Sequence, residues 1–377
     1  MSARDIIFEL DELVFCIGPV DEPKNPVGLP DVLPFRLERA SQTGLLRQQP
    51  LEDVLVALNR AYASGSLLGP AMDETVVGQP YALDFLSFVA DSVRGLQGKR
   101  ILEIGAGRGY FLKLLSDQGA FCIGIEPGLM NKPHWDRYGV DVVEGFFPDV
   151  APPGYFDAIV AYALLEHVVD PEAVLSEMRE KLHPHGMVCI SVPDCSSHII
   201  DSDCSMLFHE HFSYFDINTL RTVLINAGFG DVIITRAKYG GALYAAASIA
   251  KSEENNYLSP ICDFAKFNFT GKRNAVLKSY NSILSRGEHL GIFAPLRAIP
   301  YLPPAAKVRF FDDDESLTGR FYPTFGSPIE SRLKLYEMPV DELWVASRTF
   351  GRELIRQMSP MLPNTRVLAL SDVIKAE

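Results

Sequence analysis

Residues 207–215, with the sequence LFHEHFSYF, contain two histidines around a glutamate and four aromatic residues. His209 and His211 carry imidazoles, which with a pKa near ~6.5 can bind a metal or accept a proton at physiological pH. In an extended chain these two side chains share one face and Glu210 lies on the other, as in a half-buried strand. The spacing alone therefore leaves three interpretations: a metal site, a proton-transfer site or a plain strand.

A metal site would need further ligands near the two histidines. Cys195, His198 and Cys204 precede the stretch and offer soft or borderline donors, but their spacing matches no familiar zinc pattern. The six cysteines of the chain are scattered and include no CxxC pair, which is typical of reduced thiols. We therefore predict that no metal is bound, and we favour proton transfer.

The composition limits the classes of function that remain. A chain of 377 residues is long enough for two or three domains, and 47% hydrophobic with 22% charged residues is ordinary for a globular protein. A formal charge of −13 argues against a nucleic-acid or anionic-membrane partner. The N-terminus, MSARDIIFELDELVF, lacks the basic start and apolar run of a signal peptide. We expect a cytoplasmic protein with a small-molecule substrate, and the sequence does not decide whether it self-associates.

The most informative segment is 99–126, which reads as strand, glycine loop, helix and second strand, ending at an acid. Gly105, Gly107 and Gly109 leave the backbone bare for a ligand, and Glu126 sits where a carboxylate can accept both ribose hydroxyls of an adenosine. The loop reads GxGxG instead of GxGxxG, so an adenosine ligand without a pyrophosphate is favoured over a dinucleotide. The simpler alternative is a tight turn in an α/β domain without a ligand.

The segments that follow continue an α/β order with a closing hairpin. The patterns predict strands at 140–147, 156–162 and 187–193, helices at 172–186 and 218–229, and a hairpin at 231–250. This order, with LEIGAGRG, GIEP and LLEH, resembles the class I S-adenosylmethionine-dependent methyltransferases over residues 80–250. The resemblance implies S-adenosylmethionine as the cofactor and a Rossmann-like central domain. It also implies these cofactor-binding residues: Glu103, Gly105, Gly107, Gly109, Tyr110, Glu126, Pro127, Gly145, Phe146 and Ala161.

The flanking segments resemble a narrower family, the three-domain nucleotide-sugar C-methyltransferases. Four segments carry this resemblance in order: AYASGSLLG, EHFSYF, GIFAPLRA and the run at 308–330. The resemblance implies an N-terminal lid (1–79), the cofactor domain (80–250) and a smaller C-terminal α/β domain (251–377). It implies His211 as the base, Glu210 as its neighbouring acid, His167 and Tyr62 as donors beside a developing oxyanion, and Ser64 and Arg297 as substrate contacts. The simpler alternatives are that His167 caps a helix and that Tyr62 is ordinary lid packing.

Two departures loosen the substrate assignment. That family has an N-terminal zinc module with four cysteines, whereas Cys16 is the single cysteine in the first 100 residues here. The C-terminal loop has Phe293 and Pro295 where the family keeps smaller residues. We therefore expect C-methylation of a nucleotide-linked keto-deoxysugar, with O-methylation of a sugar or glycan as the nearest alternative. A non-catalytic cofactor-binding protein is the alternative from another class.

Overall fold

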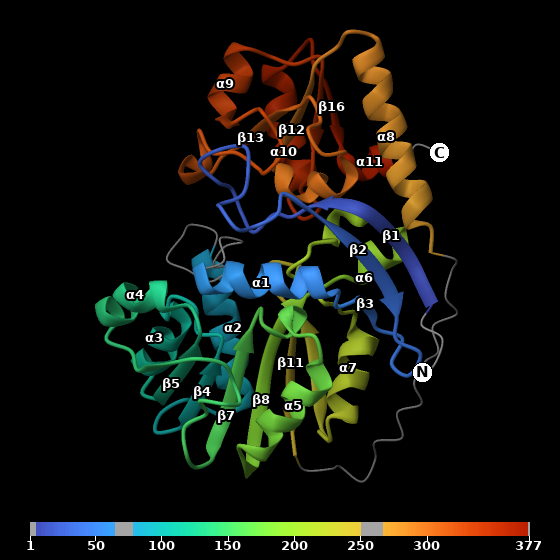
Figure 1. The fold of residues 1–377 in the computed structure, drawn as a ribbon. Helices are drawn as coiled ribbons and strands as arrows, with labels where there is room; N and C mark the ends of the chain where they lie inside the picture. The colour runs from blue at the N-terminus through green and yellow to red at the C-terminus, as the bar shows by residue number, and fades with distance from the viewer. Residues whose placement is uncertain (1–4, 65–77, 250–266, 376–377) are drawn as a thin grey trace.

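The computed structural model describes residues 5–64, 78–249 and 267–375, and within them the chain forms three β-sheets. Figure 1 shows the largest sheet below, the C-terminal sheet above, and the N-terminal strands with helix α1 between them. The described part of the chain contains no helix that is both long and apolar enough to span a membrane.

The seven-stranded sheet has the order β10-β11-β8-β7-β4-β5-β6. Its five strands from β8 to β6 are parallel, and β11 pairs antiparallel with both β8 and β10. The strands are β4 (Arg100–Ile104), β5 (Phe121–Glu126), β6 (Val142–Glu144), β7 (Phe156–Tyr162), β8 (Leu182–Pro193), β10 (Val232–Arg236) and β11 (Ala242–Ser248). The central strands are fully buried because helices cover both faces of the sheet. This is the Rossmann-like α/β architecture that the sequence indicates, closing hairpin included.

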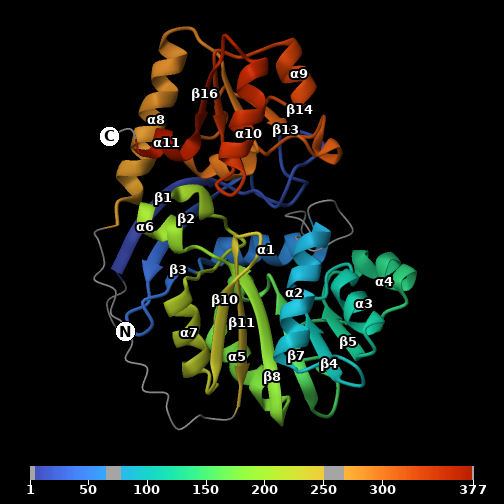
Figure 2. The same cartoon turned by 180° about the vertical axis from the view of Figure 1, so that it is seen from behind.

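Two helical layers cover this sheet on opposite faces (Figure 2). One apolar cluster joins α2 and α3 to the sheet, and another joins α5 and α7 to it. The helices are α2 (Gly78–Ser92), α3 (Tyr110–Asp117), α4 (Lys132–Tyr138), α5 (Pro171–Glu180) and α7 (Ile217–Asn226), with the short turn η1 (Leu129–Asn131) before α4. Helix α5 ends six residues before the expected boundary, because Pro184 lacks the N–H that a helix needs and 182–193 pairs as β8.

The four-stranded sheet is built from two distant parts of the chain. Its order is β1-β2-β3-β9, and all its pairs are antiparallel. Its elements are β1 (Asp5–Val14), β2 (Val32–Arg39), β3 (Leu46–Gln48) and β9 (Ser213–Tyr214), with α1 (Glu52–Ser64) beside them. Leu46 pairs with Tyr214, so the segment after the two histidines is held by the N-terminal sheet. That pairing brings the N-terminal residues onto the carboxyl end of the large sheet.

The C-terminal sheet is parallel throughout, with the order β14-β13-β12-β15-β16. Its strands are β12 (Leu290–Phe293), β13 (Arg309–Asp312), β14 (Ile329–Ser331), β15 (Glu342–Val345) and β16 (Arg366–Ala369). Its helices and short turns are α8 (Phe269–Ser285), η4 (Pro295–Tyr301), η5 (Glu315–Leu317), α9 (Arg332–Glu337), α10 (Gly351–Met358), η6 (Ser359–Met361) and α11 (Leu370–Lys375). One apolar cluster joins this sheet to the N-terminal strands, from Phe8 and Phe35 to Phe310 and Trp344.

Candidate functional site

The glycine loop lies at the carboxyl end of β4, where the sheet order reverses between β4 and β7. Gly105 and Gly109 have φ values of 75° and 80°, which residues with a side chain rarely adopt. A Cβ at Gly109 would lie 2.9 Å from the Val140 side chain. The loop therefore needs glycine for its own conformation, and the exposed backbone it creates lies where open α/β sheets bind ligands.

Glu126 at the end of β5 fixes the shape of this loop. One carboxylate oxygen accepts a hydrogen bond from the Gly107 N–H at 2.9 Å, and the other accepts from the Gly128 N–H at 2.8 Å. A carboxylate has about four lone-pair positions, so two remain for ribose hydroxyls. Burial raises the pKa of Glu126, while the two backbone N–H groups act in the opposite direction. The carboxylate is thus held ready for a ligand with neighbouring hydroxyls.

Large, exposed apolar side chains follow the strands β5 and β6 at this edge of the sheet. Leu129, Met130 and Phe146 are 50%, 54% and 59% exposed, which is unusual for large apolar residues. They follow β5 and β6, next to the carboxylate that would hold a ribose. The arrangement fits an adenosine, whose flat ring needs apolar contacts beside the ribose site. Leu129 and Met130 were not identified from the sequence, because an exposed apolar side chain has no sequence signature.

The other expected cofactor residues lie around the same edge, but they differ in which groups they can present to a ligand. Pro127 follows β5, and Gly145 precedes Phe146 after β6. Glu103 is buried at the end of β4, and burial followed by the charge of Glu126 holds its pKa well above the usual range. Tyr110 and Ala161 are 6% and 0% exposed and belong to the cores on the two faces of the sheet, so they contribute packing and backbone groups. We call Gly105, Gly107, Gly109 and Glu126 the cofactor edge.

A second group of side chains meets at the end of β7, which we call the histidine cluster: Tyr62, Glu166, His167, Glu210 and His211. His167 ends the short turn η2 (Leu165–His167), and its Nδ1 lies 2.8 Å from the Glu210 carbonyl oxygen. The Tyr62 hydroxyl, on α1, lies 3.5 Å from the same nitrogen. The rings of His167 and His211 meet edge to face with centroids 4.9 Å apart. Four of these five residues are the ones that the sequence assigns to proton transfer.

The electrostatic setting keeps both imidazoles neutral. Burial lowers the pKa of His167 to about 4, and the Glu210 carbonyl offsets only part of this effect. The pKa of His211 is well below its usual value because of burial, followed by the nearby His167 and Arg297. Burial and the charges of Glu210 and Glu166 raise the pKa of Tyr62, so its hydroxyl keeps its proton. The cluster therefore combines a free imidazole lone pair with a hydroxyl donor, the pair that general base chemistry requires.

The two histidines of the opening stretch do not share a face. The His211 N–H bonds to the Phe208 carbonyl at 3.0 Å, so the segment is a turn, and the interpretation as an extended strand is wrong. The His209 ring lies between Phe15 and Phe35, with centroids 5.5 and 5.8 Å away. It belongs to the N-terminal core, while His211 belongs to the histidine cluster. The turn forms because backbone groups on its two sides have different partners. The His209 carbonyl accepts from the Gln48 side chain, and the Phe212 N–H donates to the Glu166 carbonyl.

Of the metal donors considered from the sequence, His211 alone belongs to the donor group that meets among the described residues. Cys195 and Cys204 are buried at the starts of α6 (Ser196–Asp201) and of the turn η3 (Cys204–Met206). Among the described residues, the donor group close enough to hold an ion is Glu166, His167 and His211, whose ligand atoms lie within 4.8 Å of one another. The absence of a bound metal thus stays a prediction. Glu166 was not identified from the sequence, although the segment LLEH contains it, because its closeness to the two histidines depends on the fold.

The expected substrate contacts lie on two different elements. Arg297 is an exposed residue of η4; its guanidinium lies 5.3 Å from the centre of the Phe208 ring, and its Nη1 donates to the Ser205 carbonyl at 3.4 Å. It therefore borders the turn that carries His211. Ser64 is the last residue of α1, but its side chain lies outside the described part of the structure.

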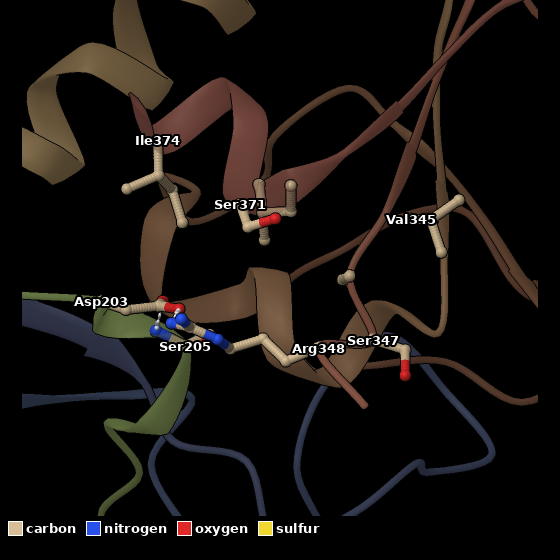
Figure 3. A pocket seen from close by; sticks show the side chains of 9 residues that line it. Asp203, Ser205, Val345, Ser347, Arg348, Ser371 and Ile374 are labelled. Carbon is tan, nitrogen blue, oxygen red and sulfur yellow. Dashed lines mark hydrogen bonds and ion pairs between the residues drawn. The ribbon is translucent and has the colours of Figure 1, made fainter. Parts of the chain in front are cut away.

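An ion-pair network connects the C-terminal sheet to the segment that precedes the histidine turn. Arg348, after β15, bonds to the carboxylates of Asp201 and Asp203. Asp203 also accepts from the Tyr301 hydroxyl at 2.6 Å and from the Ser205 N–H at 2.8 Å. Figure 3 shows Arg348 reaching toward Asp203 beside Ser205, at the edge of a small pocket. These contacts fix the η3 segment between the two sheets and so help to position the turn that follows.

Comparisons with known proteins agree with this architecture. Residues 78–232 match the family model described as a methyltransferase domain. A ubiquinone biosynthesis O-methyltransferase of Azorhizobium caulinodans is 35% identical over 109 residues, which are 27% of this chain and 43% of that protein. The C-methyltransferase NovU of Streptomyces niveus is 25% identical over 163 residues, 41% of this chain and 39% of that protein. The chain thus spans less than half the length of these two relatives.

Among solved structures, a methyltransferase of Thermotoga maritima, described as a possible histamine N-methyltransferase, aligns with 45% of this chain and 93% of its own. The identity is 18% and the TM-score 0.36. The domain match defines the central part of the chain as a class I methyltransferase fold and supports an enzyme that transfers methyl groups. Together with the cofactor edge, it supports S-adenosylmethionine as the cofactor.

Proposed function

We propose that this protein is an S-adenosylmethionine-dependent methyltransferase that acts on a sugar, with His211 as the base. The observation that carries the proposal is the meeting of Tyr62, His167, Glu210 and His211 at the carboxyl end of the sheet that also bears the glycine loop. An adenosine site beside a neutral imidazole is what methyl transfer to a weakly acidic acceptor requires.

The cofactor would lie along the cofactor edge, where its sulfonium supplies the methyl group. Glu126 would accept the ribose hydroxyls with the lone pairs that Gly107 and Gly128 leave free. The bare backbone from Gly105 to Gly109 would contact the rest of the ligand. Phe146 and its apolar neighbours would cover the adenine ring.

The acceptor would be activated by proton transfer within the histidine cluster. His211 would take a proton from a carbon next to a carbonyl, and the carbanion would attack the methyl carbon in line. The Tyr62 hydroxyl would donate to the carbonyl oxygen as negative charge develops there. His167 and Glu210 would hold the geometry, because the His167 Nδ1–H donates to the Glu210 backbone carbonyl.

The substrate class rests on the flanking regions. We divide the chain into an N-terminal lid (1–79), the cofactor domain (80–250) and a C-terminal domain (251–377), with the sugar between the last two. Arg297 would contact a phosphate of a nucleotide-linked keto-deoxysugar, since a guanidinium can grip phosphate with two N–H groups. Similarity to the C-methyltransferase NovU favours carbon as the acceptor. Similarity to ubiquinone biosynthesis O-methyltransferases favours the second candidate, O-methylation.

Hydrogen exchange separates the two candidates. Nucleotide-linked keto-sugars are incubated in deuterated water with the enzyme and the demethylated cofactor, and the α-hydrogen is followed by mass spectrometry. Carbon methylation predicts exchange that the His211→Ala variant abolishes, because a carbanion forms and is reprotonated. Methyl transfer without exchange favours the oxygen acceptor. If no sugar is methylated, the sugar assignment is wrong.

A further inference from the structure

Glu166 is the member of the histidine cluster to which the proposed function gives no role. Its side chain is 2% exposed, and its Oε2 atom has no hydrogen-bond partner among the described residues. Its Oε1 atom lies 3.9 Å from His167 Nε2, which is too long for a hydrogen bond. Because burying a carboxyl group without a partner is unfavourable, these contacts point to a ligand from outside the chain.

The distances in this group fit the ligands of one metal ion. Atoms that each lie ~2.1 Å from a zinc ion can be up to ~4.2 Å apart, a range that includes the 3.9 Å between Glu166 Oε1 and His167 Nε2. The ligand atoms of Glu166, His167 and His211 all lie within 4.8 Å of one another. Side-chain movements of about half an ångström would therefore bring all three onto a single ion.

Two hydrogen bonds already hold the segments that carry these ligands together. The Glu166 carbonyl accepts from the Phe212 N–H at 2.7 Å, and His167 Nδ1 donates to the Glu210 carbonyl at 2.8 Å. The second bond places the proton of the neutral ring on Nδ1, because a carbonyl can only accept, and so leaves a lone pair on Nε2. A histidine that binds a metal through one nitrogen usually donates the other N–H in this way.

We infer that Glu166, His167 and His211 form a binding site for a borderline divalent cation such as zinc, and that an ion bound there inhibits methyl transfer. Two imidazole nitrogens and a carboxylate oxygen suit zinc, cobalt or nickel, whereas magnesium and calcium prefer oxygen ligands alone. A water molecule would complete a four-coordinate site. The His167 side chain is 25% exposed, so an ion can reach the site from the solvent.

The inhibition follows from the single lone pair of a neutral imidazole. When the ion takes the lone pair of His211, one ring nitrogen binds the metal and the other carries a proton, so neither can accept a proton. Because His211 is the proposed base, this part of the inference rests on the proposed function. The ion is a competitor of the reaction and not its cofactor, which agrees with the prediction from the sequence that the protein needs no metal.

Cobalt(II) reports the site directly, because its visible absorption bands depend on the ligands around the ion. Untagged protein stripped with a chelator should bind a single cobalt ion per chain and show these bands, and zinc should displace the ion. Glu166→Gln keeps the shape of the side chain and removes its charge. It should weaken cobalt binding by more than about a hundredfold, since the loss of an outer partner of a ligand alone costs about 10–100-fold.

The matched control is His185→Leu, which removes one of two exposed histidines in β8, two residues from His183. Such surface pairs can also bind divalent ions. The control should keep the cobalt affinity and the absorption bands of the unmodified protein. Zinc should raise the melting temperature of both but not of Glu166→Gln, whose own cooperative transition shows that it is folded. Binding lost in His185→Leu and kept in Glu166→Gln would overturn the inference, as would the lack of saturable cobalt binding.

Methyl transfer separates the inference from the proposed function. Saturating zinc should reduce the rate by about 10² to 10⁴-fold, as loss of the base does, and a chelator should restore it. The affinity for S-adenosylmethionine should not change, because the ion does not touch the cofactor edge. Full activity with the site occupied, or activation by zinc, would overturn the inference. A protein that binds cobalt through Glu166 but methylates no sugar would support the metal site and refute the proposed function.

Discussion

The cofactor edge and the histidine cluster lie at the same end of the seven-stranded sheet, but the chain builds them differently. Gly107 and Glu126, which define the cofactor edge, are 19 residues apart within one strand-loop-helix-strand unit. In the histidine cluster, Tyr62 and His167 are separated by 105 residues and come from different layers. The first region is set by local backbone requirements, whereas the second exists only because the N-terminal sheet is completed by β9.

This difference has a functional meaning. The cofactor edge is held by backbone N–H groups of its own loop, so its geometry depends little on the flanking regions. The histidine cluster depends on α1, on the turn before β9 and on the contacts around Asp203. Substitutions in the flanking regions are therefore expected to alter the histidine cluster more than the cofactor edge. The predictions below test this separation.

The largest effect is expected from His211, the proposed base. His211→Ala should reduce methyl transfer by about 10² to 10⁴-fold, the usual contribution of a positioned base. Cofactor affinity should not change, because His211 is not part of the cofactor edge. Kinetics together with calorimetry of cofactor binding give both values.

His209→Ala is the matched control, two residues away but in the N-terminal core. It should lower the free energy of unfolding while the folded fraction keeps its kcat. Nearly full activity in His211→Ala would mean that the catalytic assignment is wrong. A similar loss of activity in both variants would mean that the cluster and the N-terminal core are not separable.

Much of this contrast reflects what a sequence can reveal. The glycine loop and Glu126 follow from a spacing that local chain geometry imposes, so they could be identified in advance, as could the order of the strands. The orientations of His209 and His211 could not, because Gln48 and Glu166 determine them from distant elements. The ion-pair partners of Arg348 could not be predicted from the sequence either, because they come together only when two sheets pack.

The second-largest effect is a loss of folding stability at low pH through His209, which lies outside the histidine cluster. Burial lowers the pKa of His209 to about 4. Above the unfolded-state pKa of ~6.5, both states hold a neutral ring and no stability is lost. As the pH falls from there toward 4, the unfolded chain binds a proton that the folded chain excludes. The free energy of unfolding should therefore fall by about 3 kcal/mol through this group.

Comparison of unfolding curves at pH 7 and pH 4.5 tests this expectation. His209→Leu should lose less stability on acidification than the unmodified protein, because the titrating group is gone. His185→Leu, at an exposed position in β8, is the control and should follow the unmodified protein. Equal acid sensitivity in all three proteins would contradict a buried neutral His209.

The third effect tests the cofactor edge. Glu126→Ala removes the groups that accept from Gly107 and Gly128 and that would accept from a ribose. S-adenosylmethionine binding should weaken by about 1–3 kcal/mol, the range for a hydrogen bond to a charged partner. Titration calorimetry measures this directly. Tight NAD binding with no response to S-adenosylmethionine would refute the methyltransferase assignment itself.

The smallest effect is expected at Arg297, which links the two regions to the C-terminal domain. Its guanidinium is exposed beside Phe208, so an ionic contact there is worth at most about 1 kcal/mol, or about fivefold in affinity. Arg297→Ala should raise the substrate KM by about that factor and leave kcat and cofactor affinity unchanged. The effect should shrink at high salt, because exposed charges are screened.

Arg352→Ala, at an exposed position of α10, controls for the loss of one positive charge from the same domain and should leave KM unchanged. An unchanged KM in Arg297→Ala would remove this arginine from substrate binding. If kcat falls instead of KM rising, Arg297 acts on His211, whose pKa it helps to lower, and belongs functionally to the histidine cluster. The two regions would then divide differently, because one residue of the C-terminal sheet would control the proposed base as well as contact the proposed substrate.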